Sequence, residues 1–178
     1  MKNNYIDKDT IKQYGSSLSG RKDNFDDDIE VRKFINFAKN YYSDKYVFVD
    51  KPYGKYGVDI GIRLDDKIVH TFDVERWNSW DKDWPHYYKY ISFLGRKEKF
   101  LNVPNNFTMV WFNNSLNKMI VVSKKNLLGV PTVSKQFSSN KKVDRVKKVP
   151  FDMGHLIGSN LTEQEKRLFV NHEETDLL

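Results

Sequence analysis

One stretch of the sequence decides the fold, and it reads Tyr56-Gly-Val-Asp59-Ile-Gly-Ile-Arg-Leu64, then Asp65-Asp66-Lys67, then Ile68-Val-His-Thr-Phe-Asp73-Val-Glu75-Arg76-Trp77. Apolar residues recur at every second position in both arms of this stretch. Alternation with a period of two is typical of β-strands that bury one face. The three polar residues between the arms suit a hairpin loop. The stretch therefore predicts a β-hairpin.

The apolar pattern also selects the register of this hairpin. If Leu64 lies opposite Ile68, then Ile60 lies opposite Phe72, and apolar residues face one another along both arms. A slip of one residue would turn every side chain of one arm to the other face of the sheet. We therefore expect the register that pairs Leu64 with Ile68.

This register brings three acids together on the polar face of the hairpin. Asp59 falls opposite Asp73, and Glu75, two residues further along, points to the same side. Like charges on opposing residues destabilise a sheet. A hard cation such as Mg²⁺ or Mn²⁺ would turn this repulsion into ligation, because such ions prefer oxygen ligands. The simpler alternative is a solvated strand face on which the acids fall by chance.

Composition removes several classes of protein. The chain has 178 residues, no cysteine and a formal net charge of +6. Disulfides, thiolate metal sites and cysteine nucleophiles are therefore excluded. There is no apolar run of about 18 residues and no apolar signal-peptide core at the N-terminus, so we expect an intracellular, cytoplasmic protein without a membrane span. The basic excess agrees with a polyanionic partner.

The order of expected elements predicts an α/β protein. Residues 1–25 are expected to form a flexible arm, residues 26–122 a core, and residues 123–178 a basic C-terminal extension packed on the same domain. Pro85 suits the first position of a second helix. The expected elements are a helix over 26–42, strands over 46–49, 56–64 and 68–76, a helix over 85–100, and strands over 107–112 and 119–122. This α-β-β-β-α-β-β order predicts a mixed central sheet flanked by helices.

The first expected helix carries an acid on its apolar side. Glu30, Phe34, Phe37 and Tyr41 follow one another at helical spacing and form one stripe. A carboxylate on an inward-facing stripe needs a partner, because burying a lone charge is costly. Glu30 therefore either takes part in a site or lies at the solvent edge of the helix.

The element order and the acids together resemble the PD-(D/E)XK nuclease superfamily, which has the restriction-endonuclease-like fold. That family places an Asp on the second strand and an (Asp/Glu)-x-Lys triplet on the third. Asp59 matches the first acid, and Asp73-Val74-Glu75 matches the triplet. Glu30 matches an acid that is common on the family's first helix. The resemblance covers residues 26–122 and implies a Mg²⁺-dependent or Mn²⁺-dependent endonuclease that hydrolyses phosphodiester bonds in DNA.

The resemblance also implies roles for the matching residues. Asp59, Asp73 and Glu75 would bind the metal together with the Val74 carbonyl, and Glu30 would hold a metal-bound water. Glu75 could instead be a general base.

Glu75 stands where the family has its lysine, a departure that some active restriction enzymes of the family share, and a nearby cation could take over the lysine's role. The nearby candidates are Arg76, Lys82 and Lys89. Arg76 should point to the other face of its strand, which leaves Lys82 and Lys89 as the expected catalytic lysines.

Two features could contact nucleic acid. A basic tract late in the chain could follow a phosphate backbone, and its expected contacts are Lys135, Lys141, Lys142, Arg145, Lys147 and Lys148. The alternative is a solvated basic face. The three tryptophans Trp77, Trp80 and Trp84 either stack on unpaired bases or close the edge of the core. His70 shares the apolar face of its strand, which favours core packing.

Two other functions stay open at this point. A nuclease-like domain without its lysine could be a catalytically inactive DNA-binding or scaffold subunit, and a nuclease of this kind could be directed at RNA. Many members of the family are dimers, so the resemblance adds a homodimer as an expectation. A phage-encoded protein acting in a host cell would suit so small a nuclease.

Overall fold

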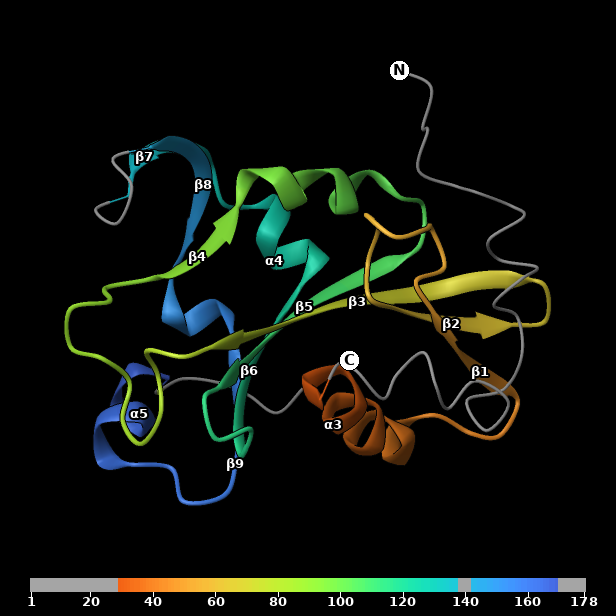
Figure 1. Ribbon diagram of the computed structural model, residues 1–178, viewed down its shortest axis with the longest axis horizontal. Coiled ribbons are helices and arrows are strands. Elements are labelled where there is room, and N and C mark those ends of the chain that lie inside the picture. The colour runs from red at the N-terminus through yellow and green to blue at the C-terminus, as the bar shows by residue number, and fades with distance from the viewer. Residues whose placement is uncertain (1–28, 138–141, 170–178) are drawn as a thin grey trace.

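The computed structural model describes residues 29–137 and 142–169 (Figure 1). The expected arm over residues 1–25 lies outside this part. The elements, in chain order, are α3 (Ile29–Ala38), η2 (Lys39–Tyr41), β1 (Tyr46–Asp50), β2 (Ile60–Leu64), β3 (Lys67–Trp77), β4 (Ile91–Leu94), η3 (Gly95–Asn102), β5 (Asn106–Asn113), β6 (Lys118–Ser123), α4 (Lys124–Leu128), β7 (Thr132–Gln136), β8 (Val143–Val149), η4 (Phe151–Met153), β9 (His155–Gly158) and α5 (Glu163–Leu168).

A six-stranded sheet forms the centre of the protein, in the order β1-β2-β3-β5-β6-β9. The β3 and β5 strands are parallel, and the other neighbours are antiparallel. The expected mixed α/β class is therefore confirmed. A second sheet of three strands, β4-β8-β7, was not expected.

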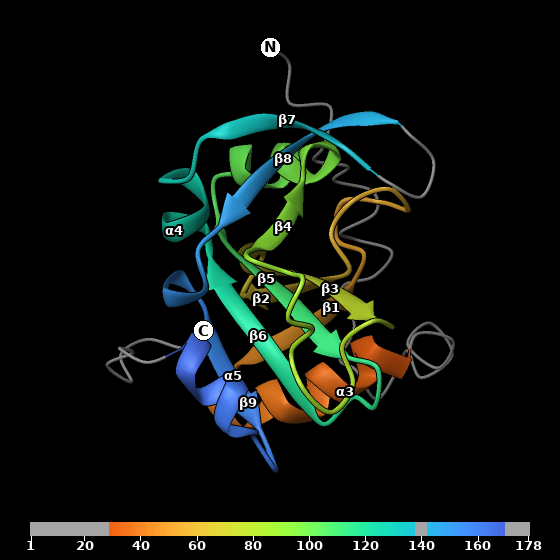
Figure 2. The same cartoon turned by 90° about the vertical axis from the view of Figure 1, so that its left-hand side faces the viewer.

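The two faces of the large sheet bury different cores. Helix α3 covers one face, where Phe34 lies 4.9 Å from Phe72 between ring centroids. The opposite face packs against η3 and the small sheet, through a core that includes Trp111 and Phe93. Figures 1 and 2 show α3 on one side of the large sheet and η3 with β4, β7 and β8 on the other.

The hairpin of β2 and β3 has the expected register in one half only. Ile60 pairs with Phe72 as predicted, but Leu64 pairs with Lys67, so the predicted pairing of Leu64 with Ile68 was wrong. The register shifts between Ile62 and Arg63. This shift shortens the loop to two residues, a length that matches the twist of the strands, with Asp65 at a φ of 52°.

The predicted helix over residues 85–100 was also wrong. Strand β4 occupies its middle, with Ile91 and Phe93 buried, and the 3₁₀ helix η3 follows. Gly95 explains the close approach of β4 to β8, because a Cβ at this position would lie 2.6 Å from the Arg145 carbonyl oxygen. Ile91 and Leu94 fit a helical spacing, but Ile91 and Phe93 fit the strand alternation that tertiary pairing selects.

Of two further expectations, one was wrong and one is confirmed. Helix α3 buries Val31, Phe34, Ile35 and Ala38, whereas Tyr41 is exposed, so the expected stripe ending at Tyr41 was wrong. His70 is buried, as expected. No helix in the described ranges is long and apolar enough to cross a membrane.

Candidate active site

Strand β3 places Asp73 and Glu75 on the face of the sheet opposite α3. Their neighbours Phe72 and Val74 belong to the core beneath α3, and alternation turns the two acids to the other side. Asp73 is almost completely buried there, whereas the Glu75 side chain remains 24% exposed. The site is therefore buried at Asp73 and reaches solvent at Glu75.

A lysine from η3 joins the two acids. The Lys97 ammonium lies 2.6 Å from Glu75 Oε1 and also forms an ion pair and a hydrogen bond with Asp73 Oδ2. The Lys97 side chain is only 11% exposed. Because a buried ammonium needs paired acceptors, these two carboxylates hold the lysine in place.

Lys97 was not among the expected site residues. The expected lysines lie in the segment after β3, and Lys97 follows them further along the chain. A signal did exist, because Leu94, Lys97 and Leu101 have a spacing of three and four residues, which puts the lysine on the apolar stripe of a helix. A lysine on such a stripe has to find an acid.

Asp59 completes the group of acids from the other arm of the hairpin. It directly precedes β2, and its backbone carbonyl accepts a hydrogen bond from Lys51 N at 2.9 Å. Its carboxylate accepts a hydrogen bond from Val74 N at 2.8 Å and lies close enough to Asp73 to influence that group's ionisation. The expected meeting of Asp59 with Asp73 is thus present.

The electrostatics of the site favour a charged lysine. Burial acts to lower the pKa of Lys97, but the attraction of Asp73 and Glu75 outweighs burial and raises it. Burial raises the pKa of Asp73, and the Lys97 ammonium opposes that rise. Lys97 therefore remains protonated, and its charge limits the net rise in the pKa of Asp73.

The core of the protein orients Glu75 from its other side. Trp111 Nε1 donates a hydrogen bond to Glu75 Oε2 at 3.1 Å, and Trp111 itself is fully buried on β5. One oxygen of Glu75 thus contacts Lys97 and the other contacts Trp111. The carboxylate is fixed at the edge of the site rather than mobile in solvent.

The acids fit a magnesium ion in a limited way. In residues 29–137 and 142–169, no group of three or more His, Cys, Asp or Glu side chains is arranged to hold a metal. Mg²⁺, however, keeps several waters and needs only one or two carboxylates from the protein. Asp59 and Asp73 provide these, and Lys97 contacts both Asp73 Oδ2 and Glu75 Oε1 beside them.

Three of the predicted site residues do not join this group. Glu30 is half-buried on α3, which covers the opposite face of the sheet. Lys89 is exposed and donates a hydrogen bond to the His86 carbonyl at 3.1 Å. The Lys82 side chain is exposed, and its backbone carbonyl accepts a hydrogen bond from Lys118. The structure thus brings Lys97 to the acids in place of Lys82 and Lys89.

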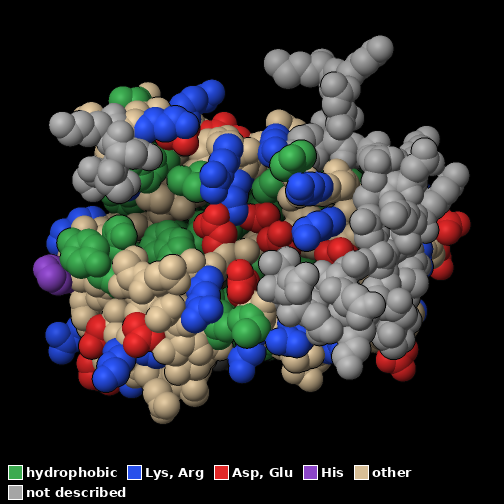
Figure 3. All heavy atoms as spheres, in the orientation of Figure 1, with side chains coloured by type: hydrophobic (Ala, Val, Ile, Leu, Met, Phe, Trp, Pro, Cys, Tyr) green, Lys and Arg blue, Asp and Glu red, His purple; other side chains and the backbone are tan. Residues whose placement is uncertain are grey.

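The basic tract lies on the β7–β8 hairpin, which borders the site. Lys142, Arg145 and Lys148 are exposed, and Lys135 is half-buried. Lys147 differs, because it is buried and donates a hydrogen bond to the Val130 carbonyl at 2.6 Å, so it does not face a ligand. Lys141 lies outside the described residues. Figure 3 shows acidic side chains in the middle of one face of the molecule, with basic side chains above and below them.

The three tryptophans divide between core and surface. Trp80 and Trp84 are buried, so these two close the core. Trp77 is half-buried and lines a cleft of about 430 Å³ together with Glu75. Among the three tryptophans, Trp77 is therefore the one that borders a space that a ligand can enter.

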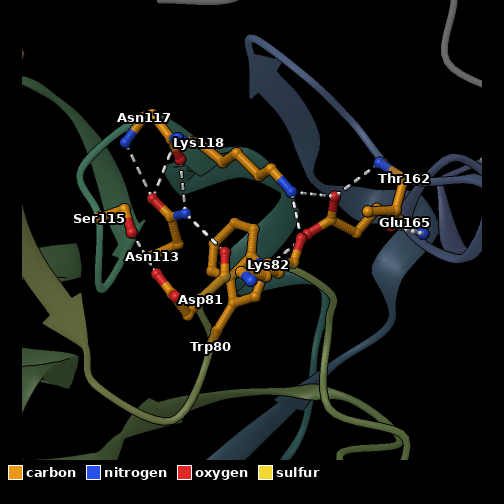
Figure 4. A network of polar contacts seen from close by, with 9 residues as sticks. All are labelled: Trp80, Asp81, Lys82, Asn113, Ser115, Asn117, Lys118, Thr162 and Glu165. Atoms are coloured by element: carbon orange, nitrogen blue, oxygen red, sulfur yellow. Dashed lines mark hydrogen bonds and ion pairs between the residues drawn. The ribbon is translucent and has the colours of Figure 1, made fainter.

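A second buried lysine pairs with an acid elsewhere in the protein. Lys118 on β6 lies 2.8 Å from Glu165 Oε2, and Trp80 Nε1 donates to Glu165 Oε1 at 2.7 Å. Thr162 N also donates to Glu165 in a capping box at the start of α5. Figure 4 shows Glu165 enclosed by these partners, which tie α5 to β6 and to the loop after β3.

Comparison with known proteins identifies no relative: no family model, no curated protein and no solved structure matches the chain. The geometry of the site is therefore the basis for proposing a function.

Proposed function

We propose that this protein is a metal-dependent endonuclease that hydrolyses phosphodiester bonds in DNA. The observation that carries the proposal is the contact of Lys97 with both Asp73 and Glu75. The segment that resembles the PD-(D/E)XK triplet has Glu75 in place of the lysine. A different element, η3, brings Lys97 to Asp73 and Glu75. A lysine beside two clustered carboxylates is the group that the proposed chemistry needs.

Asp59 and Asp73 would hold Mg²⁺ or Mn²⁺ in this proposal. When bound, such an ion polarises the phosphate and lowers the pKa of bound water. Their carboxylates are suitable donors, because hard cations prefer oxygen ligands. Burial raises the pKa of Asp73, and the adjacent Lys97 ammonium limits that rise and so favours the ionised form that binds a cation.

Lys97 and Glu75 would act on the reacting groups. Water attacks the phosphorus atom and loses its proton to the Glu75 carboxylate, which lines the cleft beside the site. The bond from phosphorus to the leaving oxygen breaks, and that oxygen takes up a proton from solvent. The Lys97 ammonium stabilises the negative charge that develops on the phosphate oxygens.

The surface around the site suits a polyanion. Lys142, Arg145 and Lys148 are exposed on the β7–β8 hairpin, and the chain carries a net charge of +6. Cations on such a surface attract phosphates by releasing condensed counterions from DNA. These exposed residues and Lys135 remain the expected phosphate contacts.

The test compares two aspartates of the same hairpin. Supercoiled plasmid is incubated with Mg²⁺ and with the wild-type protein, Asp73→Asn or Asp66→Asn. Asp66 is exposed at the hairpin tip and serves as the matched control. We expect nicking and linearisation by the wild-type protein and Asp66→Asn, and none by Asp73→Asn. Equal cleavage by all three proteins would remove the proposal, as would no cleavage by any folded protein.

One observation favours a second candidate, a DNA-binding subunit without catalysis. The described part of the chain contains no three-carboxylate metal cluster, and the Lys97 ammonium already pairs with both Asp73 and Glu75. Calorimetric titration with Mn²⁺ separates the two candidates. The endonuclease needs a site that Asp59→Ala abolishes, whereas the binding subunit needs none. Cleavage of matched RNA and DNA strands distinguishes a DNA-directed from an RNA-directed enzyme.

A further inference from the structure

The cleft next to Glu75 has the composition of a site for a flat, polar ring. Its volume is about 430 Å³, within the range of small-ligand pockets. Aromatic side chains come from three separate segments of its lining, namely Trp77, Tyr88 and Phe137. Polar groups lie among them, at Ser92, Lys135 and Gln136. An apolar slot with a few convergent polar groups suits a nucleobase.

The aromatic wall is held in a fixed position. The Trp77 ring lies 5.5 Å from the Tyr88 ring, 5.3 Å from Trp84 and 6.3 Å from Trp111, measured between centroids. Trp84 and Trp111 are buried and support Trp77 from behind. The Tyr88 hydroxyl lies 3.2 Å from Ser79 Oγ. A preorganised wall of this kind offers a stacking surface at little entropic cost.

One lysine lines the cleft, and a second lies close to it. The Lys135 ammonium lies 5.0 Å from the ring centroids of both Phe137 and Tyr90, and it donates a hydrogen bond to Ser92 Oγ at 3.3 Å. The Lys148 ammonium lies 5.0 Å from Tyr90 on the same small sheet. Aromatic rings next to basic groups are the combination that holds single-stranded nucleic acid, because bases stack while phosphates pair with cations.

We propose that this cleft binds one unpaired nucleobase of the DNA strand whose phosphate lies at Asp73 and Glu75. The proposal rests on the endonuclease function proposed above and names its substrate class, which is DNA with an unpaired nucleotide beside the scissile bond. Glu75 links the two places, because it contacts Lys97 in the site and also lines the cleft. A base inside a regular duplex is stacked on its neighbours and would first have to leave the stack.

The test measures binding without metal, so that cleavage does not interfere. Two fluorescent duplexes of one sequence are compared, one with a single unpaired 2-aminopurine and one with that base paired to thymine. We expect the wild-type protein to bind the unpaired form about tenfold more tightly, the size of effect that one stacked base gives. We also expect the 2-aminopurine fluorescence to fall on binding.

The variants remove two cleft aromatics, and leucine replaces Tyr88 because Tyr88 also packs against the core. Phe137→Ala and Tyr88→Leu should each reduce the preference for the unpaired duplex to less than about twofold, while affinity for the paired duplex stays unchanged. Tyr87→Ala is the control, because Tyr87 is 59% exposed and does not line the cleft. It should retain the full preference.

Two results would overturn the inference: equal binding of both duplexes by the wild-type protein, or a preference that persists in both cleft variants. Cleavage that depends on Asp73 but shows no such preference would remove the inference and leave the proposed function. A cleft-dependent preference in a protein that never cleaves DNA would remove the proposed function and support the binding site.

Discussion

The protein buries two lysines against carboxylates, and the two sites differ in what surrounds the acid. Glu165 is completely buried, and Trp80, Lys118 and Thr162 all donate hydrogen bonds to it. Glu75 pairs with Lys97 and Trp111, yet its side chain is 24% exposed and lines a cleft. The Glu165 site is closed, because it leaves no route to a ligand. The Glu75 site is open, because it reaches the cleft. A buried ion pair thus points to function only when one partner reaches a space that a ligand can enter.

The closed site should carry the larger share of stability. Replacing Lys118 with Met leaves the Glu165 carboxylate buried without its cation, so we expect the free energy of unfolding to fall by about 3–5 kcal/mol. Lys166→Met is the control, because Lys166 pairs with Glu163 in solvent, where an ion pair contributes little to stability. Urea denaturation measures both. Equal losses of unfolding free energy in the two variants would mean that the Lys118–Glu165 pair contributes no more to stability than an exposed pair does.

The open site should carry activity instead. Lys97→Met removes the cation that stabilises charge on the phosphate, so we expect the single-turnover rate of DNA cleavage to fall about 10²–10³-fold. Lys97→Met also leaves Asp73 buried without its cation, so the rate is measured under conditions in which urea denaturation shows the variant to be folded. Lys99→Met tests a lysine of the same 3₁₀ helix whose ammonium contacts the Tyr56 carbonyl. A cleavage rate unchanged in Lys97→Met would remove the lysine from the mechanism.

Another buried titratable group, His70, should dominate the acid sensitivity of the fold. Its ring nitrogens contact Tyr42 OH at 3.2 Å and Thr108 Oγ1 at 2.8 Å, and burial lowers its pKa to about 4. The unfolded chain has a histidine pKa of about 6.5, so it binds the proton more readily than the folded protein does. The stabilisation from the neutral ring is therefore complete above pH 6.5 and is lost as the pH falls towards 4, by up to about 3 kcal/mol.

Unfolding curves between pH 7 and pH 4 check this prediction. His70→Gln should show a shallower decline of stability over that range than the wild-type protein. The exposed His86 provides the control, and His86→Gln should follow the wild-type curve. An equally steep decline in His70→Gln would assign the acid sensitivity to the carboxylate sites.

Strand β8 also carries one buried lysine and one exposed lysine. The expected effect of replacing them, on DNA binding, is the smallest of those predicted. Lys148 is exposed, whereas Lys147 is buried against the Val130 carbonyl. Lys148→Gln should reduce the slope of log K against log salt for DNA binding by about 0.7–0.9, the effect of one lost phosphate contact. Lys147→Gln should leave that slope unchanged. Fluorescence titrations at several salt concentrations measure both, and identical slopes for the two variants would refute the assignment.

The sequence predicted the parts of the site that depend on local pattern. Alternation in the hairpin correctly turned Asp73 and Glu75 to one face and brought Asp59 to Asp73. It missed the shift between Ile62 and Arg63, because a bulge leaves no mark on the apolar pattern. The resemblance to a nuclease family came from these local features and is still a proposal.

The parts that depend on long-range contact were not predictable in the same way. Lys97 meets Asp73 across 24 residues, and β4 is a strand because it pairs with β8, far along the chain. Tertiary pairing of this kind overrides the helical spacing of Ile91 and Leu94. Likewise, the sequence marks Lys147 and Lys148 as equals, and only the fold separates the buried one from the exposed one.

The most direct test of the open site is a calorimetric titration of the full-length protein with Mn²⁺. We predict a site in the wild-type protein and in Glu163→Gln, which changes an exposed acid that does not line the cleft, and the loss of that site in both Asp59→Asn and Asp73→Asn. Mn²⁺ binding of equal strength in the wild-type protein and both site variants would contradict the account, and so would a wild-type protein that binds no Mn²⁺ at all.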